Sequence, residues 1–434
     1  MEKPCSCIHS LANGDRSKEV RFWRFLRHDE VSPEAIFGAA GERTGKLAAG
    51  RAVVVFQDMS DLVLGGAKRK RQGFGPVGKG GSARGVKLHA ALAADAMTGD
   101  VLGLTGGAVW NRTGGKRVKA RSKRAPEEKE SQVWNDGAVA AGRVLAEAAS
   151  VTVVSDRESD IYVDYARRPA NVDLLIRARH DRCLAQGGKL YAALDAMAPA
   201  GAAETVDIPA KPGQAARQAK LEVRFTLAQI KAPTTGMPAA NLRQLPRSLV
   251  IYALDVREIS PPPGITPIHW RLISSKPVTT RAAALGLVAL YRRRWTIEEY
   301  FHSLKTGGFN IEAAETGEPA ALMTLVAAAA VAAVTVMQLL KARDNPQGQA
   351  IAAVFESTDC KLIEAISKRY EGPHPTPRQK NPHPKTSLAY ATWVIGRLGG
   401  WTGYYGKPGP KTLNWGLQAF HNIKQGADIH AKDM

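Results

Sequence analysis

The chain has 434 residues, with 60 Lys and Arg against 40 Asp and Glu, and its formal charge at pH 7 is +20. This length allows two or three domains with a substantial core. The positive excess favours a polyanionic partner, and nucleic acid comes first because each neutralised phosphate releases counterions. Four Cys are too few for a disulfide scaffold, and the N-terminus lacks the apolar run of a signal peptide, so we expect a cytoplasmic, reducing setting.

In the first half of the chain, apolar and β-branched runs alternate with helical patterns and glycine-rich basic loops. The predicted helices are 17–50, with a start at Ser32-Pro33-Glu34, and 134–149. The predicted strands are 52–58, a pair within 86–110 joined at Thr98-Gly99-Asp100, 151–156 and 173–179. The predicted loops are 65–85 and 112–124, which are dense in Lys and Arg. We expect these loops to contact a nucleic-acid backbone, with solvated charge as the alternative.

The second half begins with a β-rich stretch and continues with helical patterns. Alternating residues punctuated by Pro and Gly predict an antiparallel β insertion between residues 181 and 270. The apolar segment 321–340 has the length of a membrane span, about 20 residues. It is rich in Ala and has no partner span and no aromatic belt, so we expect a buried core helix and no membrane association.

Four side chains near residue 300 share a helical spacing. Tyr291, Arg294, Glu298 and Lys305 stand at offsets of 0, 3, 7 and 14 in a stretch free of Pro and Gly. An α-helix turns by about 100° per residue, so these offsets place all four on one stripe of a single helix. A carboxylate can hold a divalent metal, and the cations and phenol can hold phosphates. The alternative is an exposed helix face with an ion pair between Arg294 and Glu298.

Two acidic residues each follow an apolar run. Asp58 ends the predicted strand 52–58 and Asp156 ends the predicted strand 151–156. Sites in open α/β sheets form at the carboxyl ends of strands, so these acids with Glu298 could form a three-carboxylate cluster. Such a cluster could hold two divalent metals for phosphodiester chemistry. The alternative for each Asp is a turn-forming or helix-capping residue.

Several short motifs carry a resemblance to a known family. They are Asp156-Arg157-Glu158-Ser159-Asp160-Ile161, the Tyr291, Arg294, Glu298 and Lys305 set, Glu128-Lys129-Glu130-Ser131 with Trp134, Arg177, the segment 258–278, Leu398-Gly399-Gly400 and the segment 408–418. Together they resemble the DDE transposases of bacterial insertion sequences and composite transposons. The subgroup is the one whose third motif is called YREK. The resemblance covers roughly residues 20 to 430.

The resemblance implies an α/β fold with an RNase H-like catalytic core, a β-rich insertion domain and a mainly helical C-terminal region. Residues 1–50 would be a residual N-terminal helical region, which is a shortened form of the part that binds the DNA ends. The catalytic core would be formed by residues 51–180 and by residues 271–342, which contain the Glu298 helix, with the insertion at 181–270 between them. Residues 343–434 would form the C-terminal dimerisation region. The implied partners are transposon-end DNA and target DNA, bound by a homodimer in a synaptic complex. The implied place of action is the cytoplasm, at the nucleoid.

The resemblance also assigns roles to individual residues. Two Mg²⁺ or Mn²⁺ ions per site would be held by the catalytic residues Asp58, Asp156 and Glu298. Tyr291, Arg294 and Lys305 would grip DNA phosphates beside the scissile bond. Trp270 would stack on a base flipped from the transposon end, with an ordinary core tryptophan as the alternative. Arg177 and Arg179, at a predicted strand end near the acids, are expected to meet the DNA close to the cut, and Arg157 is expected to bind DNA.

The sequence departs from the family pattern at two places. Met59-Ser60-Asp61 stands where the family often has a hydroxyl-rich pair, which leaves Asp61 as an alternative ligand. Only 57 residues precede Asp58, and the family usually has a longer region there. Despite these departures, the resemblance leads us to expect a transposase that cuts the ends of its element and transfers the strands to target DNA. One alternative is an N-terminally truncated, dimerising inhibitor that lacks specific end binding, and another is a plain metal-dependent nuclease that nicks DNA without joining it.

Overall fold

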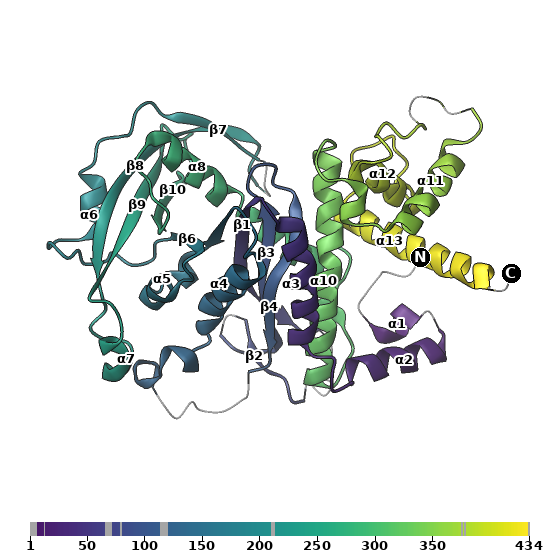
Figure 1. Ribbon diagram of the computed structural model, residues 1–434, viewed down its shortest axis with the longest axis horizontal. Helices are drawn as coiled ribbons and strands as arrows, with labels where there is room; N and C mark the ends of the chain where they lie inside the picture. The colour runs from purple at the N-terminus through teal and green to yellow at the C-terminus, as the bar shows by residue number, and fades with distance from the viewer. Residues whose placement is uncertain are drawn as a thin grey trace. The chain divides into compact units, whose positions relative to one another are not determined.

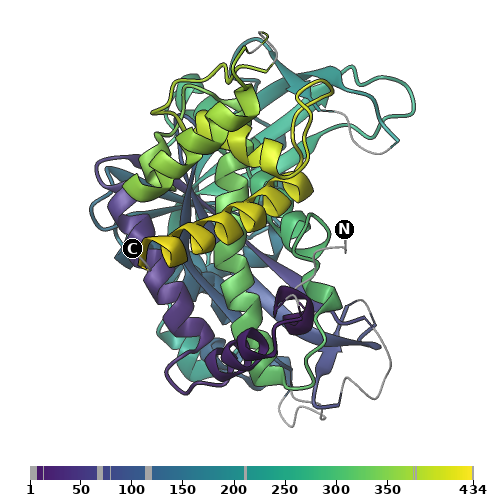
Figure 2. The same ribbon diagram turned by 90° about the vertical axis from the view of Figure 1, so that its right-hand side faces the viewer.

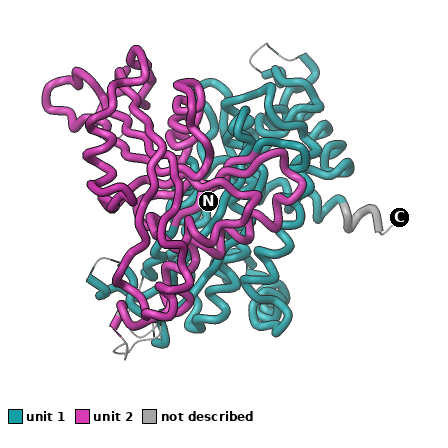
Figure 3. Tube along the Cα trace, turned by 60° about the vertical axis from the view of Figure 1, so that its left-hand side comes forward, with its two compact units in different colours: residues 1–52, 59–115, 296–434 teal, residues 53–58, 116–295 magenta. Residues whose placement is uncertain are grey.

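The computed structural model describes residues 7–12, 14–65, 72–78, 80–112, 120–209, 213–374, 376 and 379–432 (Figure 1). Helices and strands are both abundant in it, so the expected α/β class is confirmed. The chain forms two compact units (Figure 3). Unit 1 holds residues 1–52, 59–115 and 296–434, and unit 2 holds 53–58 and 116–295. Most of the basic residues in the two predicted loops, including 68–71 and Lys116, Arg117 and Lys119, lie outside the described residues.

The sheet of unit 1 is built on an antiparallel hairpin of β3 (Ala83–Asp95) and β4 (Val101–Trp110). The Asp95 carboxylate accepts the amides of Met97 and Thr98 and so fixes the turn, which the sequence places correctly. β2 (Gly75–Val77) pairs antiparallel with the first residues of β3. The expectation that residues 65–85 form only loop was wrong, because β2 and the start of β3 occupy part of this range.

β1 (Ala52–Val63) is longer than its apolar run predicts. The amide of Leu64 donates to the Arg84 carbonyl, and the amide of Ala96 donates to the Ala52 carbonyl, so the ends of β1 that belong to unit 1 lie beside the ends of β3. The expectation that Asp58 ends this strand was therefore wrong. Backbone bonds to a neighbouring strand continue β1 through polar residues that the apolar pattern excludes.

Helices cover the hairpin of unit 1. α3 (Pro33–Ala48) and α10 (Pro319–Asp344) pack on β4, and α10 also packs on α12 (Leu388–Leu398) and α13 (Pro410–Lys432). Figure 2 shows α13 crossing α10. The other helices of this unit are α1 (Ile8–Ala12), α2 (Arg16–Leu26), α9 (Trp295–Lys305, from Thr296 onward) and α11 (Ser357–Glu371).

The apolar segment 321–340 forms most of α10. Within the described residues this is the one helix long and apolar enough to cross a membrane, and 67% of its most apolar window is buried inside the protein. Gln338 in the same helix donates to the Val101 carbonyl at 3.2 Å. These contacts are those of a core helix packed on a sheet.

Unit 2 contains a sheet that changes from parallel to antiparallel. β5 (Ser150–Ser155) runs parallel to β6 (Val172–Arg177), and β6 pairs antiparallel with β10 (His269–Ser274). The sheet continues through the antiparallel strands β9 (Ser248–Ile259), β8 (Arg217–Lys231) and β7 (Glu204–Ile208). Its helices are α4 (Gln132–Val144), α5 (Tyr162–Arg167), α6 (Leu190–Asp195), α7 (Ala239–Arg243) and α8 (Arg281–Arg292).

The single helix expected through residues 291–305 was wrong. α8 ends at Arg292 and α9 begins at Trp295, with a turn between them. In this turn the Arg294 amide donates to the Tyr291 carbonyl at 3.0 Å, which is an i to i−3 bond in place of the α-helical i to i−4 bond. Tyr291, Arg294 and Glu298 therefore stand on three successive elements, and the stripe inferred from one helical repeat does not exist.

Candidate active site

Asp58 and Arg294 form the charged pair at the centre of the site in unit 2. A guanidinium N–H of Arg294 donates to Asp58 Oδ2 at 3.0 Å. Asp58 lies within β1, and Arg294 lies in the turn that follows α8. The two side chains are 20% and 16% exposed, so solvent reaches the pair while the surrounding protein restricts its geometry. An acid and a base 236 residues apart in the chain are thus brought together.

Tyr291, Trp270 and Arg177 gather beside this pair. Tyr291 is buried at the end of α8, and the half-buried Trp270 meets it edge-on, with ring centroids 5.5 Å apart. Burial raises the pKa of the Tyr291 phenol, against the opposing charges of Arg294 and Arg177. Burial likewise lowers the pKa of Arg177, although its interaction with Tyr291 works in the opposite direction. The phenol therefore stays protonated at neutral pH between two guanidinium groups.

Asp156 lies directly after β5, as the sequence predicts. Its Oδ1 accepts the Glu158 amide at 2.8 Å and so caps the short helix Arg157–Ser159. Its charge also acts on Tyr291, raising the pKa of the phenol. Asp156 therefore caps a short helix, which is the alternative role considered for it, and its charge also reaches Tyr291 in the candidate site. The charge of Arg157 lowers the pKa of Arg177, so these two guanidinium groups are also neighbours.

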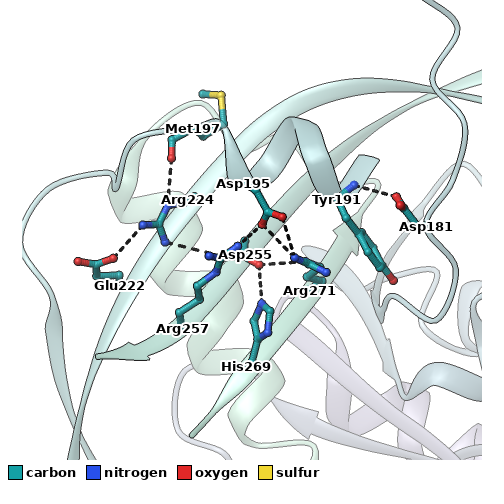
Figure 4. A network of polar contacts seen from close by, with 10 residues as sticks. All are labelled: Asp181, Tyr191, Asp195, Met197, Glu222, Arg224, Asp255, Arg257, His269 and Arg271. Carbon is teal, nitrogen blue, oxygen red and sulfur yellow. Dashed lines mark hydrogen bonds and ion pairs between the residues drawn. The ribbon is translucent and has the colours of Figure 1, made fainter. Parts of the chain in front are cut away.

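A network around Asp255 fixes the strand that carries Trp270 (Figure 4). Asp255 is fully buried on β9 and accepts from Arg257, from Arg271 at 3.2 Å and from His269 at 2.8 Å. His269 and Arg271 flank Trp270 on β10. Because side chains alternate along a strand, the network holds one face of β10 and Trp270 projects from the other.

Glu298 and Lys305 belong to unit 1, on α9. The half-buried Glu298 lies in the first turn of this helix. The Lys305 ammonium group, in the last turn, donates to the Asp61 carbonyl at 2.6 Å and lies 3.6 Å from Glu312 Oε1. Lys305 therefore ties the end of α9 to β1.

Asp61, the alternative ligand, has a different set of partners. Its carboxylate lies 2.8 Å from the Lys87 ammonium group and accepts the Gly78 amide at 2.9 Å. Burial works to raise the pKa of Asp61, but Lys87, the Gly78 amide and Arg112 outweigh it, so the pKa is lower than usual. These contacts give Asp61 a structural role between β1 and β3.

The three expected carboxylates differ in the support that the structure gives them as ligands of a divalent cation. Carboxylate oxygens are the ligands that Mg²⁺ prefers, and Asp58 already accepts from a cationic group, so its chemistry fits. Within the residues that the structure describes, no three His, Cys, Asp or Glu form a group that could hold a metal ion. Asp58 and Asp156 belong to one unit and Glu298 to the other, so the three-ligand set stays a prediction.

Sequence reasoning missed the role of Asp160. This carboxylate is 3% exposed, and its Oδ2 accepts the amides of Arg179 at 2.7 Å and His180 at 3.0 Å. It also pairs with Arg182. The last acid of the Asp156–Ile161 motif thus holds the segment that follows β6. The position of Asp160 at the end of the polar run 156–160, directly before Ile161, was the one available signal.

The comparison with known families assigns this chain to a class. A family model described as a transposase DDE domain matches residues 65–334, which is more than half of the chain. The matched range contains Asp156, Trp270, the Tyr291–Lys305 segment, Arg157 and Arg177, and it begins after Asp58. The chain belongs to the DDE transposase family. A transposase function follows from this membership, and DNA is the substrate that the family implies.

Proposed function

We propose that this chain cuts phosphodiester bonds at the ends of a transposon and transfers the freed strands into target DNA. It would do so as a member of the YREK group with an RNase H-like core. The observation that carries the proposal is the Asp58–Arg294 pair, because it joins an acid and a phosphate-binding cation of two separate motifs. Tyr291, Arg177 and Asp156 gather in the same unit.

Asp58, Asp156 and Glu298 would hold two divalent cations, Mg²⁺ or Mn²⁺. When bound, such ions activate a water molecule or a 3′-hydroxyl and stabilise the leaving oxygen in an in-line displacement. In the protein without DNA, Arg294 balances the charge of Asp58 through an ion pair. We propose that it turns to the DNA phosphate when the carboxylate finds another cationic partner.

The remaining residues would position the DNA. Tyr291 is kept neutral by burial and can donate its hydroxyl proton to a phosphate oxygen, while Arg177 and Arg294 supply positive charge beside it. Trp270 is half-buried and so keeps surface that a flipped base could stack on. Lys305 would contact a phosphate beside the scissile bond, and Arg157 would also contact the DNA backbone.

Strand cleavage tests the proposal directly. The substrate is DNA that carries the inverted repeats flanking the coding sequence, incubated with Mg²⁺. Glu298→Gln should abolish cleavage, because the amide keeps the shape of the side chain and loses the charge. Glu299→Gln is the matched control, since Glu299 is exposed and lies 3.5 Å from Lys341. If the Glu298→Gln protein cuts as well as the unaltered chain, the assignment of Glu298 is wrong.

The same experiment separates transposase from regulator. A protein that acts on its own element should bind the repeats in a gel shift, assemble as a dimer on them and cut them, acting in the cytoplasm at the nucleoid. A chain that dimerises but neither binds nor cuts the repeats would instead be an inhibitor of transposition.

A further inference from the structure

A basic pocket of about 970 Å³ lies in unit 2 next to the candidate site. Lys129, Arg179, Arg182 and Lys231 line it together with a single carboxylate, that of Asp160. The segment 232–237, which follows β8, forms another part of its wall. None of the residues that the proposed function uses lines this pocket, so that proposal does not account for it.

The position of the pocket connects it to the site through two short chain segments. Arg177 ends β6, and Arg179 lies two residues later in the pocket wall. Asp156 and Arg157 follow β5, and Asp160 lies in the same wall. A polymer bound at Arg157 and Arg177 would therefore need only a short further path to enter the pocket.

The pocket wall is held rigidly on one side. Asp160 accepts the backbone amides of Arg179 and His180 and pairs with Arg182, which also donates to the Asp160 carbonyl at 3.0 Å. The Arg182 side chain is only 10% exposed, and its Nε has no hydrogen-bond partner within the described residues. On the opposite wall, Lys129 donates to the Gly236 carbonyl at 2.8 Å.

The charge that remains in the pocket is positive. Asp160 compensates Arg182, but neither Arg179 nor Lys231 forms an ion pair with any residue that the structure describes. Both are exposed at the mouth of a cavity whose size falls in the range of about 300–1,000 Å³ typical of ligand sites. Clustered cations without acidic partners bind phosphate groups through charge-assisted hydrogen bonds.

We propose that this pocket is a second phosphate-binding site, which takes a phosphodiester segment of the DNA next to the one held at the cutting site. The inference rests on the proposed function for the identity of the polymer. Arg179 and Lys231 contact phosphate oxygens, and Asp160 with Arg182 keeps the wall in place. The contacts are sequence-independent, because they reach the backbone and not the base edges.

DNA binding measured without added divalent metal tests the inference apart from cleavage. The Arg179→Ala/Lys231→Ala protein should bind more weakly than the unaltered chain. The slope of log affinity against log salt concentration should also become shallower. The loss of up to about two phosphate contacts reduces this slope by roughly 0.9 per contact for duplex DNA. Lys220→Ala is the matched control, because Lys220 is an exposed lysine on the same strand and does not line the pocket.

Two substrates identify the form of the ligand. A loss confined to a single-stranded oligonucleotide assigns the pocket to an unpaired strand, and a loss on a duplex assigns it to the double helix; either result supports the site. Affinity and salt slope equal to those of Lys220→Ala on both substrates would overturn it. If the double variant binds DNA more weakly but the unaltered chain never cuts DNA, the proposed function is refuted and the phosphate-binding site is still supported.

Discussion

Arg294 donates to Asp58 Oδ2 at 3.0 Å, which links the turn after α8 to the middle of β1. Arg294 is therefore more than a phosphate-binding cation presented on a helix face. In the free protein it balances the charge of an acid that the family resemblance assigns to metal binding. The same guanidinium group also acts on the Tyr291 phenol, so three of the expected site residues are electrostatically coupled.

Replacing Arg294 should lower activity more than binding. Arg294→Ala removes both the partner of Asp58 and a donor to the reacting phosphate, and loss of one such donor reduces turnover by about 10²–10³. Cleavage rates and DNA affinity, measured in parallel, check this. The control is Arg292→Ala, because Arg292 is exposed and donates to the Asp207 carbonyl. Equal effects of the two substitutions on cleavage would contradict the assignment.

Removing the charge of Asp255 should destabilise unit 2. Asp255→Asn leaves Arg257, Arg271 and His269 without their buried partner, and breaking a buried ion pair costs about 3–5 kcal/mol. We expect the lower end of this range, because the three cationic side chains are partly exposed. Urea denaturation measures the change.

Asp195→Asn is the matched control for this prediction. Asp195 pairs with the same two arginines, but its side chain is 47% exposed, so its loss should cost less than about 1 kcal/mol. If both substitutions shift the unfolding midpoint equally, the burial of Asp255 does not increase its contribution to stability, and the prediction is contradicted.

The buried carboxyl of Asp164 predicts a pH dependence of stability. Burial raises the pKa of Asp164, and the charge of Asp136 adds to the rise, while Arg167 and Arg182 oppose it. A raised pKa in the folded state means that the folded protein favours protonated Asp164. The contribution of this protonated group to the free energy of unfolding is therefore present below the usual pKa of 3.8 and is lost as pH rises through the folded-state pKa.

Asp164→Asn tests this sign, because the amide is neutral at every pH. The difference in unfolding free energy between the Asn variant and the unaltered chain should grow in favour of Asn from about pH 5 to about pH 8. Urea midpoints at both values measure it. A constant difference across this interval would mean that Asp164 is not protonated in the folded protein.

Two glycines should respond to alanine in opposite directions. A Cβ at Gly85 would lie 1.9 Å from the Leu62 carbonyl oxygen, so Gly85→Ala must push β3 away from β1 and should cost about 1–3 kcal/mol. Gly286 lies within α8 with no atom within 4 Å of an added Cβ. Gly286→Ala should stabilise the protein by about 0.5–1 kcal/mol. Thermal unfolding of both variants checks the pair, and a loss from both would contradict the account.

Much of the local structure could be predicted from the sequence. The run 151–155 is β-branched apart from its Ser, and the strand β5 ends at Ser155, one residue before the predicted end at Asp156. The turn between β3 and β4 was also predictable, because Thr-Gly-Asp has the chemistry of a tight turn. The long β1 and the break between α8 and α9 were not predictable, since both depend on bonds to partners that no local pattern encodes.

The sequence by itself determined which residue types carry the chemistry: acids after apolar runs, a Tyr, Arg, Glu and Lys set, and a strong excess of positive charge. It could not decide how these residues meet. Only the tertiary structure pairs Arg294 with Asp58, places Trp270 against Tyr291 and brings Arg179 and Lys231 into the lining of one basic pocket. The physical reason is that spacing along a chain fixes faces within one element, whereas strand pairing and turns between helices bring distant residues together.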